Sequence, residues 1–270
     1  MAAAPAGHMK NAAHAEWTKL RTVRSTGWLL LGLIVATVLV GALTTATMHT
    51  AHCPTPAGCL EDTTKDSLTG VRVGQIAVVL LAVSVIGNEY GTGMIQTSLT
   101  AFPRRLTLLT GKALLLVTLV AATSTLAVLG SLWAGRTILA GNGFTPEHGY
   151  PALSPTDGPT LRAAAGTVLY LVLIALLAFG VAITVRDTAG AVTVLLTLLY
   201  ILPLLVQTIT DATWHDRLEK LPPTTAGLAM TYTRNLDQLP IGPWPGITLL
   251  AGYTAAALLL GGLRFTRRDA

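Results

Sequence analysis

Six long runs of uncharged, mostly apolar residues divide the chain. A transmembrane helix needs about 20 predominantly apolar residues, and in lipid a helix satisfies its own backbone hydrogen bonds. The second uncharged run starts at Val73, but its helix is expected to begin near residue 70, because the long side chain of Arg72 can extend to the membrane surface. The pattern predicts an all-α integral membrane protein with six transmembrane helices. The predicted spans are residues 27–47, 70–88, 113–135, 163–185, 189–210 and 247–263.

The composition agrees with a membrane protein. The chain has 270 residues, of which 51% are hydrophobic and 11% are charged, whereas a soluble domain usually carries about 25% charged residues. A soluble protein of this length has room for one core but not for six uncharged runs of this length. We expect residues 1–26 to form an N-terminal segment, residues 27–264 the transmembrane domain, and residues 265–270 a basic tail.

The distribution of basic residues predicts the orientation. With the N-terminus inside, eleven of the 18 Lys and Arg residues lie in the inner segments. Positively charged residues favour the cytoplasmic side of a membrane, so both termini are predicted to be cytoplasmic, in a multi-pass protein of the cell membrane. The net charge of +5 is then an orientation signal and requires no nucleic acid.

The residues before the first run suggest a helix at the membrane surface. Trp17, Leu20 and Arg24 follow a helical spacing, and Lys19 and Arg21 lie elsewhere around the helix. Such a helix would rest in the inner headgroup layer, with Trp17 as its anchor and the basic residues near the headgroups. The alternative is an ordinary basic stretch beside the membrane.

Two cysteines, Cys53 and Cys59, follow the first run in a predicted outer loop. Disulfides persist outside the cell, and the Pro and Gly residues between the two cysteines favour a turn. His49 and His52 leave a metal site as the alternative, but the spacing matches no zinc module. We therefore favour a disulfide and predict no metal site. A second outer segment, residues 224–232, is predicted to form a short helix at the outer interface.

The longest inner loop carries a short amphipathic pattern. Ile95, Leu99 and Phe102 lie at i, i+4 and i+7, giving a short helix one apolar stripe. Such a helix either rests on the membrane or inserts into a groove of a partner. Glu89 is expected to favour the start of this helix and to fix a turn at Tyr90 and Gly91.

The chain resembles permease subunits of ABC-2 type transporters, particularly actinobacterial ones. The likeness lies in residues 16–26 (EWTKLRTVRST), residues 88–97 (NEYGTGMIQT) followed by Pro-Arg-Arg at 103–105, and residues 186–191 (RDTAGA). The sequence departs from the family pattern at Gly91, where a basic residue is common, and at Met94. The six-span plan and the basic tail also fit, so the likeness covers nearly the whole chain.

The resemblance implies a dimer of six-span subunits, either a homodimer or a pair with a sister permease, that binds two cytoplasmic ATPase subunits. It implies an ATPase-coupling segment made of Glu89, Tyr90, Gly91, Thr92, Ile95, Leu99, Phe102, Arg104 and Arg105. The sequence has no Walker A motif. We therefore expect no enzymatic activity and no cofactor in this chain, with ATP and Mg²⁺ used by the partner ATPase.

Three residues within the spans mark a predicted translocation path: Gln75, Pro203 and Gln207. The resemblance places the second and fifth helices at the dimer interface, with Leu81 and Leu199 expected near the partner. The glutamines are alternatively paired locally near the headgroups, and Pro203 is expected to bend the fifth helix. The lack of charge inside the spans favours a lipophilic or amphiphilic substrate, such as a drug, an antibiotic or a lipid, that is exported.

Two other classes of function compete with transport. An intramembrane enzyme needs ionisable or nucleophilic groups at membrane depth, but the sequence has no His-Glu-x-x-His, no Gly-x-Ser-x-Gly and no paired carboxylates within a span. An accessory or immunity-type membrane protein without transport shares the same apolar pattern. Co-purification of an ATPase distinguishes a permease from it.

Overall fold

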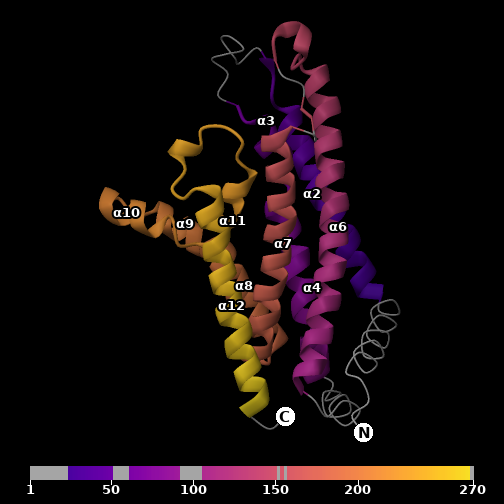
Figure 1. The fold of residues 1–270 in the computed structure, drawn as a ribbon, viewed down its shortest axis with the longest axis vertical. Coiled ribbons are helices and arrows are strands. Elements are labelled where there is room, and N and C mark those ends of the chain that lie inside the picture. The colour runs from indigo at the N-terminus through magenta and orange to yellow at the C-terminus, as the bar shows by residue number, and fades with distance from the viewer. Residues whose placement is uncertain (1–23, 51–60, 92–104, 151–152, 155–156, 268–270) are drawn as a thin grey trace.

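The computed structural model describes residues 24–50, 61–91, 105–150, 153–154 and 157–267. These residues form helices and loops and no strands. The long helices are α2 (Arg24–Ala46), α4 (Val71–Gly91), α6 (Arg105–Gly141), α7 (Gly158–Val185) and α12 (Pro243–Arg267), which run roughly side by side (Figure 1). The fifth predicted span is made of α8 (Thr188–Leu196), the π turn η3 (Thr197–Ile201) and α9 (Leu202–Gln207).

The surface of this bundle is apolar. Five helices are long and apolar enough to cross a membrane, namely Ser25–Ala46, Thr107–Gly141, Gly158–Val185, Thr188–Gln207 and Pro243–Thr266. Trp28 and Trp133 are each 71% exposed, and large apolar side chains of α9 and α12 are exposed as well. Apolar surface of this extent marks an interaction site or a membrane. The all-α membrane class is therefore confirmed. The second predicted span contains a shorter apolar stretch, Val71–Gly87.

The middle helix of the bundle is α7. It packs against α12, α4 and α6, while α2 packs against α4 and α6. Tyr170, Leu171 and Ile174 of α7 are fully buried. At the α7–α12 crossing, a Cβ on Gly180 would lie 2.7 Å from the Ala257 backbone. The absence of a side chain there lets the two helices approach closely, as small residues do in membrane bundles.

Helix ends differ most from the prediction in α6, which has 37 residues where a span of 113–135 was expected. Lys112 and Arg136 lie inside the helix, and Lys112 is only 2% exposed. A charged residue ends an apolar run, but it does not end a helix. The helix stops where Gly143 adopts a φ of 93°, which glycine tolerates, and where Asn142 Nδ2 donates to the Met48 carbonyl at 2.8 Å.

Two other long helices also extend past their predicted spans. α7 begins at Gly158, ahead of the predicted residue 163, with Pro159 in its first turn, a position that suits proline. α4 continues to Gly91. The turn expected at Tyr90 and Gly91 is therefore wrong, since both residues belong to α4, and glycine is common where a helix ends.

The π turn η3 ends two residues before Pro203, the residue expected to bend the fifth helix. The helix ends at Gln207, ahead of the predicted residue 210. In Figure 1, α9 and α10 (Ala212–Leu218) run toward the left, away from the line of α8 and α12.

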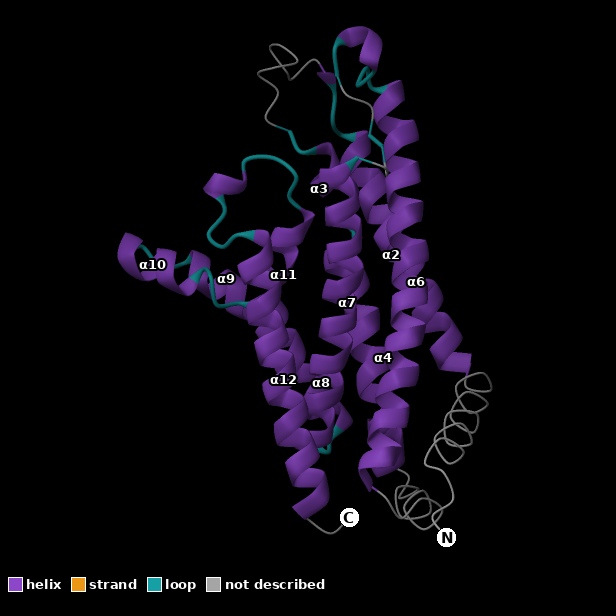
Figure 2. Ribbon diagram, viewed as in Figure 1, coloured by secondary structure: helices purple, strands orange, loops and turns teal. Residues whose placement is uncertain are grey.

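The short helices are shown with their connecting loops in Figure 2. They are α3 (Thr63–Ser67), η2 (Pro146–His148), α10, α11 (Pro223–Leu228), η4 (Ala229–Thr231) and η5 (Leu236–Gln238). The short helix predicted over residues 224–232 is confirmed as α11 and η4. Ala226, Leu228 and Met230 are buried, because this segment packs against α7 and α12.

Candidate binding cavity between α4 and α9

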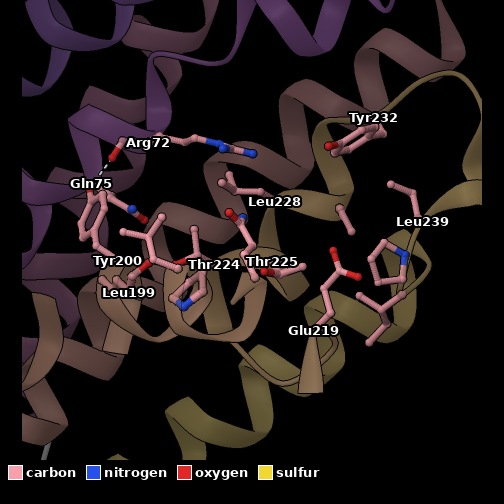
Figure 3. A pocket seen from close by; sticks show the side chains of 16 residues that line it. Arg72, Gln75, Leu199, Tyr200, Glu219, Thr224, Thr225, Leu228, Tyr232 and Leu239 are labelled. Carbon is pink, nitrogen blue, oxygen red and sulfur yellow. Dashed lines mark hydrogen bonds between the residues drawn. The ribbon is translucent and has the colours of Figure 1, made fainter. Parts of the chain in front are cut away.

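A cavity of about 370 Å³ lies between the first turns of α4, the η3–α9 segment, and the α11–η4 segment. Gln75, Pro203 and Gln207 all line it. The three residues predicted to mark a translocation path are therefore brought together, although Gln75 is more than 120 positions from the other two in the sequence. We call this space the α4–α9 cavity (Figure 3).

The polar wall of the cavity is built around Gln75, whose side chain is fully buried. Its Oε1 accepts a hydrogen bond from the Tyr170 hydroxyl of α7. The alternative considered for Gln75 was a hydrogen bond to a neighbouring group in the protein. Its side-chain oxygen makes such a bond. Its Nε2 has no well-formed hydrogen bond among the described residues, although the Gln75 side chain lies beside the Tyr200 hydroxyl and interacts with it. A buried amide donor without a partner is costly.

Pro203 shapes the second wall through the backbone of η3. Proline has no N–H, so the carbonyl of Leu199, four residues earlier, loses its helical donor. Thr224 Oγ1 of α11 donates to this carbonyl at 2.7 Å. The hydrogen bond attaches α11 to the fifth helix at its irregular turn and thereby positions the residues that close the cavity.

Two charged residues line the cavity, Arg72 and Glu219. Figure 3 shows the Arg72 guanidinium extending into the cavity, with the Glu219 carboxylate on the other side. Glu219 Oε2 lies 3.5 Å from His215 Nε2, whereas the guanidinium of Arg72 has no ion pair within the described part of the chain. The Arg72 carbonyl accepts from the Tyr200 hydroxyl, which fixes its backbone beside the cavity.

The remaining lining is apolar. Leu199, Leu204, Leu228, Leu239, Pro240 and Ile241 supply most of it. Leu204 is 60% exposed, so the cavity opens to the bundle surface on this side. A space with a polar wall, one unpaired cation and an apolar opening suits an amphiphile better than a small ion.

A second cavity, of about 590 Å³, adjoins the first and shares Tyr232, Leu239 and Pro240 with it. Tyr232 stands between the two spaces and is held from two sides. Arg162 Nη2 donates to its carbonyl at 2.7 Å, and Lys65 Nζ lies 4.8 Å from the centre of its ring, within cation–π range.

Asp62, a residue that sequence reasoning missed, fixes the segment after Tyr232. Its buried carboxylate caps α3 by accepting from the Lys65 backbone at 3.1 Å. It also accepts from the backbone N–H groups of Thr233 and Arg234, at 2.5 and 3.0 Å. The run Asp62-Thr-Thr is a recognisable helix-capping signal, but nothing in the sequence pairs it with residues so far along the chain.

At the opposite end of the bundle, Arg186 and Asp187 form the short connection between α7 and α8. Arg186 adopts a positive φ of 63°, and the Asp187 carboxylate caps α8 by accepting from Gly190 N at 2.5 Å. Arg264 of α12 donates to the Thr184 carbonyl at 3.2 Å, which joins α7 and α12 beside this turn.

Other predicted site residues stay predictions. In the coupling segment, Glu89 lies near the end of α4 and Arg105 begins α6, while Thr92, Ile95, Leu99, Phe102 and Arg104 lie outside the described residues. Trp17, Lys19 and Arg21 also lie outside them, and Arg24 begins α2.

The cysteine pair, Cys53 and Cys59, likewise lies outside the described ranges, so the disulfide stays a prediction. The described residues contain no disulfide and no group of three or more His, Cys, Asp or Glu placed to hold a metal ion.

No protein-family model matches the chain, and no curated protein matches it significantly.

Proposed function

We propose that this chain is the transmembrane permease subunit of an ATP-driven ABC-2 type transporter that exports a lipophilic or amphiphilic compound across the cell membrane. ATP hydrolysis takes place in a separate cytoplasmic subunit. The observation that carries the proposal is the α4–α9 cavity, which is lined by Gln75, Pro203 and Gln207 from the second and fifth helices. The resemblance to ABC-2 permeases supports the assignment to this class of transporter.

The six-span arrangement is part of the proposal. α4 has 21 residues, which at 1.5 Å per residue reach about 30 Å, the thickness of the hydrocarbon layer. With α4 counted as a span, the N-terminal end of α2 and the C-terminal end of α12 both point toward the lower end of Figure 1. The basic residues near these ends support a cytoplasmic location for that side.

Dimerisation through the second and fifth helices is also proposed, but on faces other than those first expected. Leu81 and Leu199 are 2% and 1% exposed and belong to the core of the subunit itself. Exposed apolar positions on these helices include Val73, Val194 and Ile201. We place the partner permease against these positions.

The experiment is reconstitution of the chain with its ATPase in proteoliposomes, followed by ATP-dependent movement of labelled amphiphiles. Thr225→Trp, which fills the α4–α9 cavity, is expected to abolish transport while the ATPase stays bound. Leu259→Trp, on an exposed face of α12, is the matched control and is expected to transport normally. An accessory protein without transport would move no amphiphile with any ATPase, and an ATPase-inactive partner measures the background.

A further inference from the structure

The α4–α9 cavity contains an unpaired donor and an unpaired charge. Gln75 Nε2 is fully buried and lacks a hydrogen-bond partner among the described residues, and the Arg72 guanidinium reaches into the same space (Figure 3). Buried polar groups without partners are rare in folded proteins, and each calls for an explanation. A ligand atom that accepts a hydrogen bond would explain the buried Gln75 donor. Arg72 is exposed, so a negative ligand charge can reach its guanidinium from the open side of the cavity.

From these groups we propose that the α4–α9 cavity binds the anionic, oxygen-bearing headgroup of an amphiphile. Gln75 Nε2 donates to a headgroup oxygen, and Arg72 neutralises the headgroup charge. The inference deepens the proposed function by naming the class of substrate, and it rests on that function only for the statement that the bound amphiphile is moved.

The charges of the cavity select an anion over a cation. Glu219 is the only acidic residue among those lining the cavity, and His215 lies beside its carboxylate. The Arg72 guanidinium, in contrast, forms no ion pair with a carboxylate in the described part of the chain. A guanidinium presents a planar fork of N–H donors that matches phosphate or carboxylate oxygens, and such charge-assisted bonds are about twice as strong as neutral ones.

The apolar side of the cavity gives the ligand a tail. Leu199 and Leu204 line the wall beside the opening, and Leu204 and Leu205 are exposed on the same helix. A volume of about 370 Å³ is within the range of ligand sites and holds a headgroup with the first part of a chain. The rest of the chain would lie along this exposed face in the lipid.

The test is equilibrium binding of labelled dodecyl phosphate to the chain alone in phosphatidylcholine nanodiscs, with empty nanodiscs as the blank. Inorganic phosphate tests whether the headgroup suffices, and dodecyltrimethylammonium tests the sign of the charge. We expect saturable binding of dodecyl phosphate, with at least about 10-fold weaker binding of each of the other two probes. Equal binding of inorganic phosphate would replace the amphiphile site with a plain anion site, and equal binding of the ammonium probe would overturn the charge assignment.

The variants assign the binding to the two residues. Arg72→Gln and Gln75→Met are each expected to weaken dodecyl phosphate binding about 10-fold or more, since each removes one hydrogen bond to a charged group. Arg72→Lys keeps the charge and is expected to restore most of the affinity. Arg136→Gln removes an exposed charge from α6, away from this cavity, and is expected to bind like the wild type.

Thermal stability of each variant is measured in the same nanodiscs to confirm that the bundle is folded. Wild-type affinity in both folded variants, Arg72→Gln and Gln75→Met, contradicts the inference. Because no ATPase is present, a failure of transport leaves the binding result intact. Binding that is lost in the variants while transport persists supports the binding site but contradicts its role in transport.

Discussion

Asp62 and Thr233 are joined by two hydrogen bonds across 171 positions of the chain: Asp62 Oδ2 accepts from the Thr233 backbone at 2.5 Å, and Oδ1 accepts from Thr233 Oγ1 at 2.7 Å. The same carboxylate caps α3. One buried side chain thus connects the segment before α4 to the segment before α12, beside the wall that Tyr232 forms between two cavities.

Replacing Asp62 is expected to destabilise the protein. Asp62→Ala removes a helix cap and several hydrogen bonds to a buried charge, a loss of about 2–4 kcal/mol. The measurement is the temperature at which the detergent-solubilised protein loses its monodisperse elution peak. Asp237→Ala, an exposed aspartate in the same outer segment, is the control and is expected to elute as the wild type does. Equal stability of the two variants would show that the Asp62 contacts contribute nothing.

The contribution of Asp66 to the stability of the wild type is expected to fall as the pH rises above about 4. Burial raises the pKa of Asp66 above its usual 3.8, and the carboxylates of Asp62 and Glu61 raise it further, against the lowering effect of Lys65. The folded state then binds the Asp66 proton more tightly than the unfolded state does, so stability decreases between the unfolded and the folded pKa.

The check on this pH dependence is a comparison with Asp66→Asn, which has no charge to bury. Thermal stability of both proteins is followed from about pH 3.5 to 7. The variant should gain on the wild type as the pH rises, and the difference should level off above the folded pKa. A difference that is constant over the whole range rejects the role of Asp66.

The hydrogen bond from Thr224 to the Leu199 carbonyl is expected to matter only because residue 203 is proline. Thr224→Val leaves that buried carbonyl without a donor and should cost about 1–3 kcal/mol. In Pro203→Ala, an N–H at residue 203 becomes available to the carbonyl, so the same Thr224→Val change should cost less. A double-mutant cycle measures the difference as a coupling energy. Strictly additive effects of the two substitutions would show that the N–H of residue 203 does not replace the Thr224 hydroxyl as the donor to the Leu199 carbonyl.

Cysteine crosslinking tests the dimer face. In a background without Cys53 and Cys59, single cysteines at Val73 and Ile201, which are exposed on the second and fifth helices, should give a dimer band after oxidation. A cysteine at Leu81, which is buried in the subunit, should not. If a cysteine at Leu259 on α12 crosslinks and cysteines at Val73 and Ile201 do not, the dimer interface lies on another face of the subunit.

The coupling segment is tested by charge. Burying one apolar side chain of the Ile95, Leu99 and Phe102 stripe in an ATPase groove is worth about 1.5–3 kcal/mol, so Ile95→Asp or Leu99→Asp should separate the ATPase from the permease. Thr97→Asp, which lies off the stripe, is the matched control and should co-purify with the ATPase in the normal ratio. Retention of the ATPase by both stripe variants means that the segment is only a connector at the membrane surface.

Helix positions were predictable from the sequence because uncharged runs mark them, whereas helix faces were not. Lys112 and Arg136 ended apolar runs and hid the true length of α6. Leu81 and Leu199 lie well inside their runs, and a run with few polar positions gives little sign of which side faces the core. Gln75, Pro203 and Gln207 were recognisable as exceptions in apolar surroundings, and they share one cavity. Asp62 belongs to a contact between distant segments, which leaves no periodic signal in either one.

The π turn at Thr197–Ile201 also sets a rotational register. An α-helix advances about 100° per residue, so the extra residue in this turn determines which side of α9 points to the cavity. Deleting one residue from the turn would rotate Pro203, Leu204 and Gln207 together by about that angle and would present a different wall to a bound molecule, with no side chain in the wall replaced. Chains that differ by a single-residue insertion or deletion at this turn would thus differ in the compounds they accept.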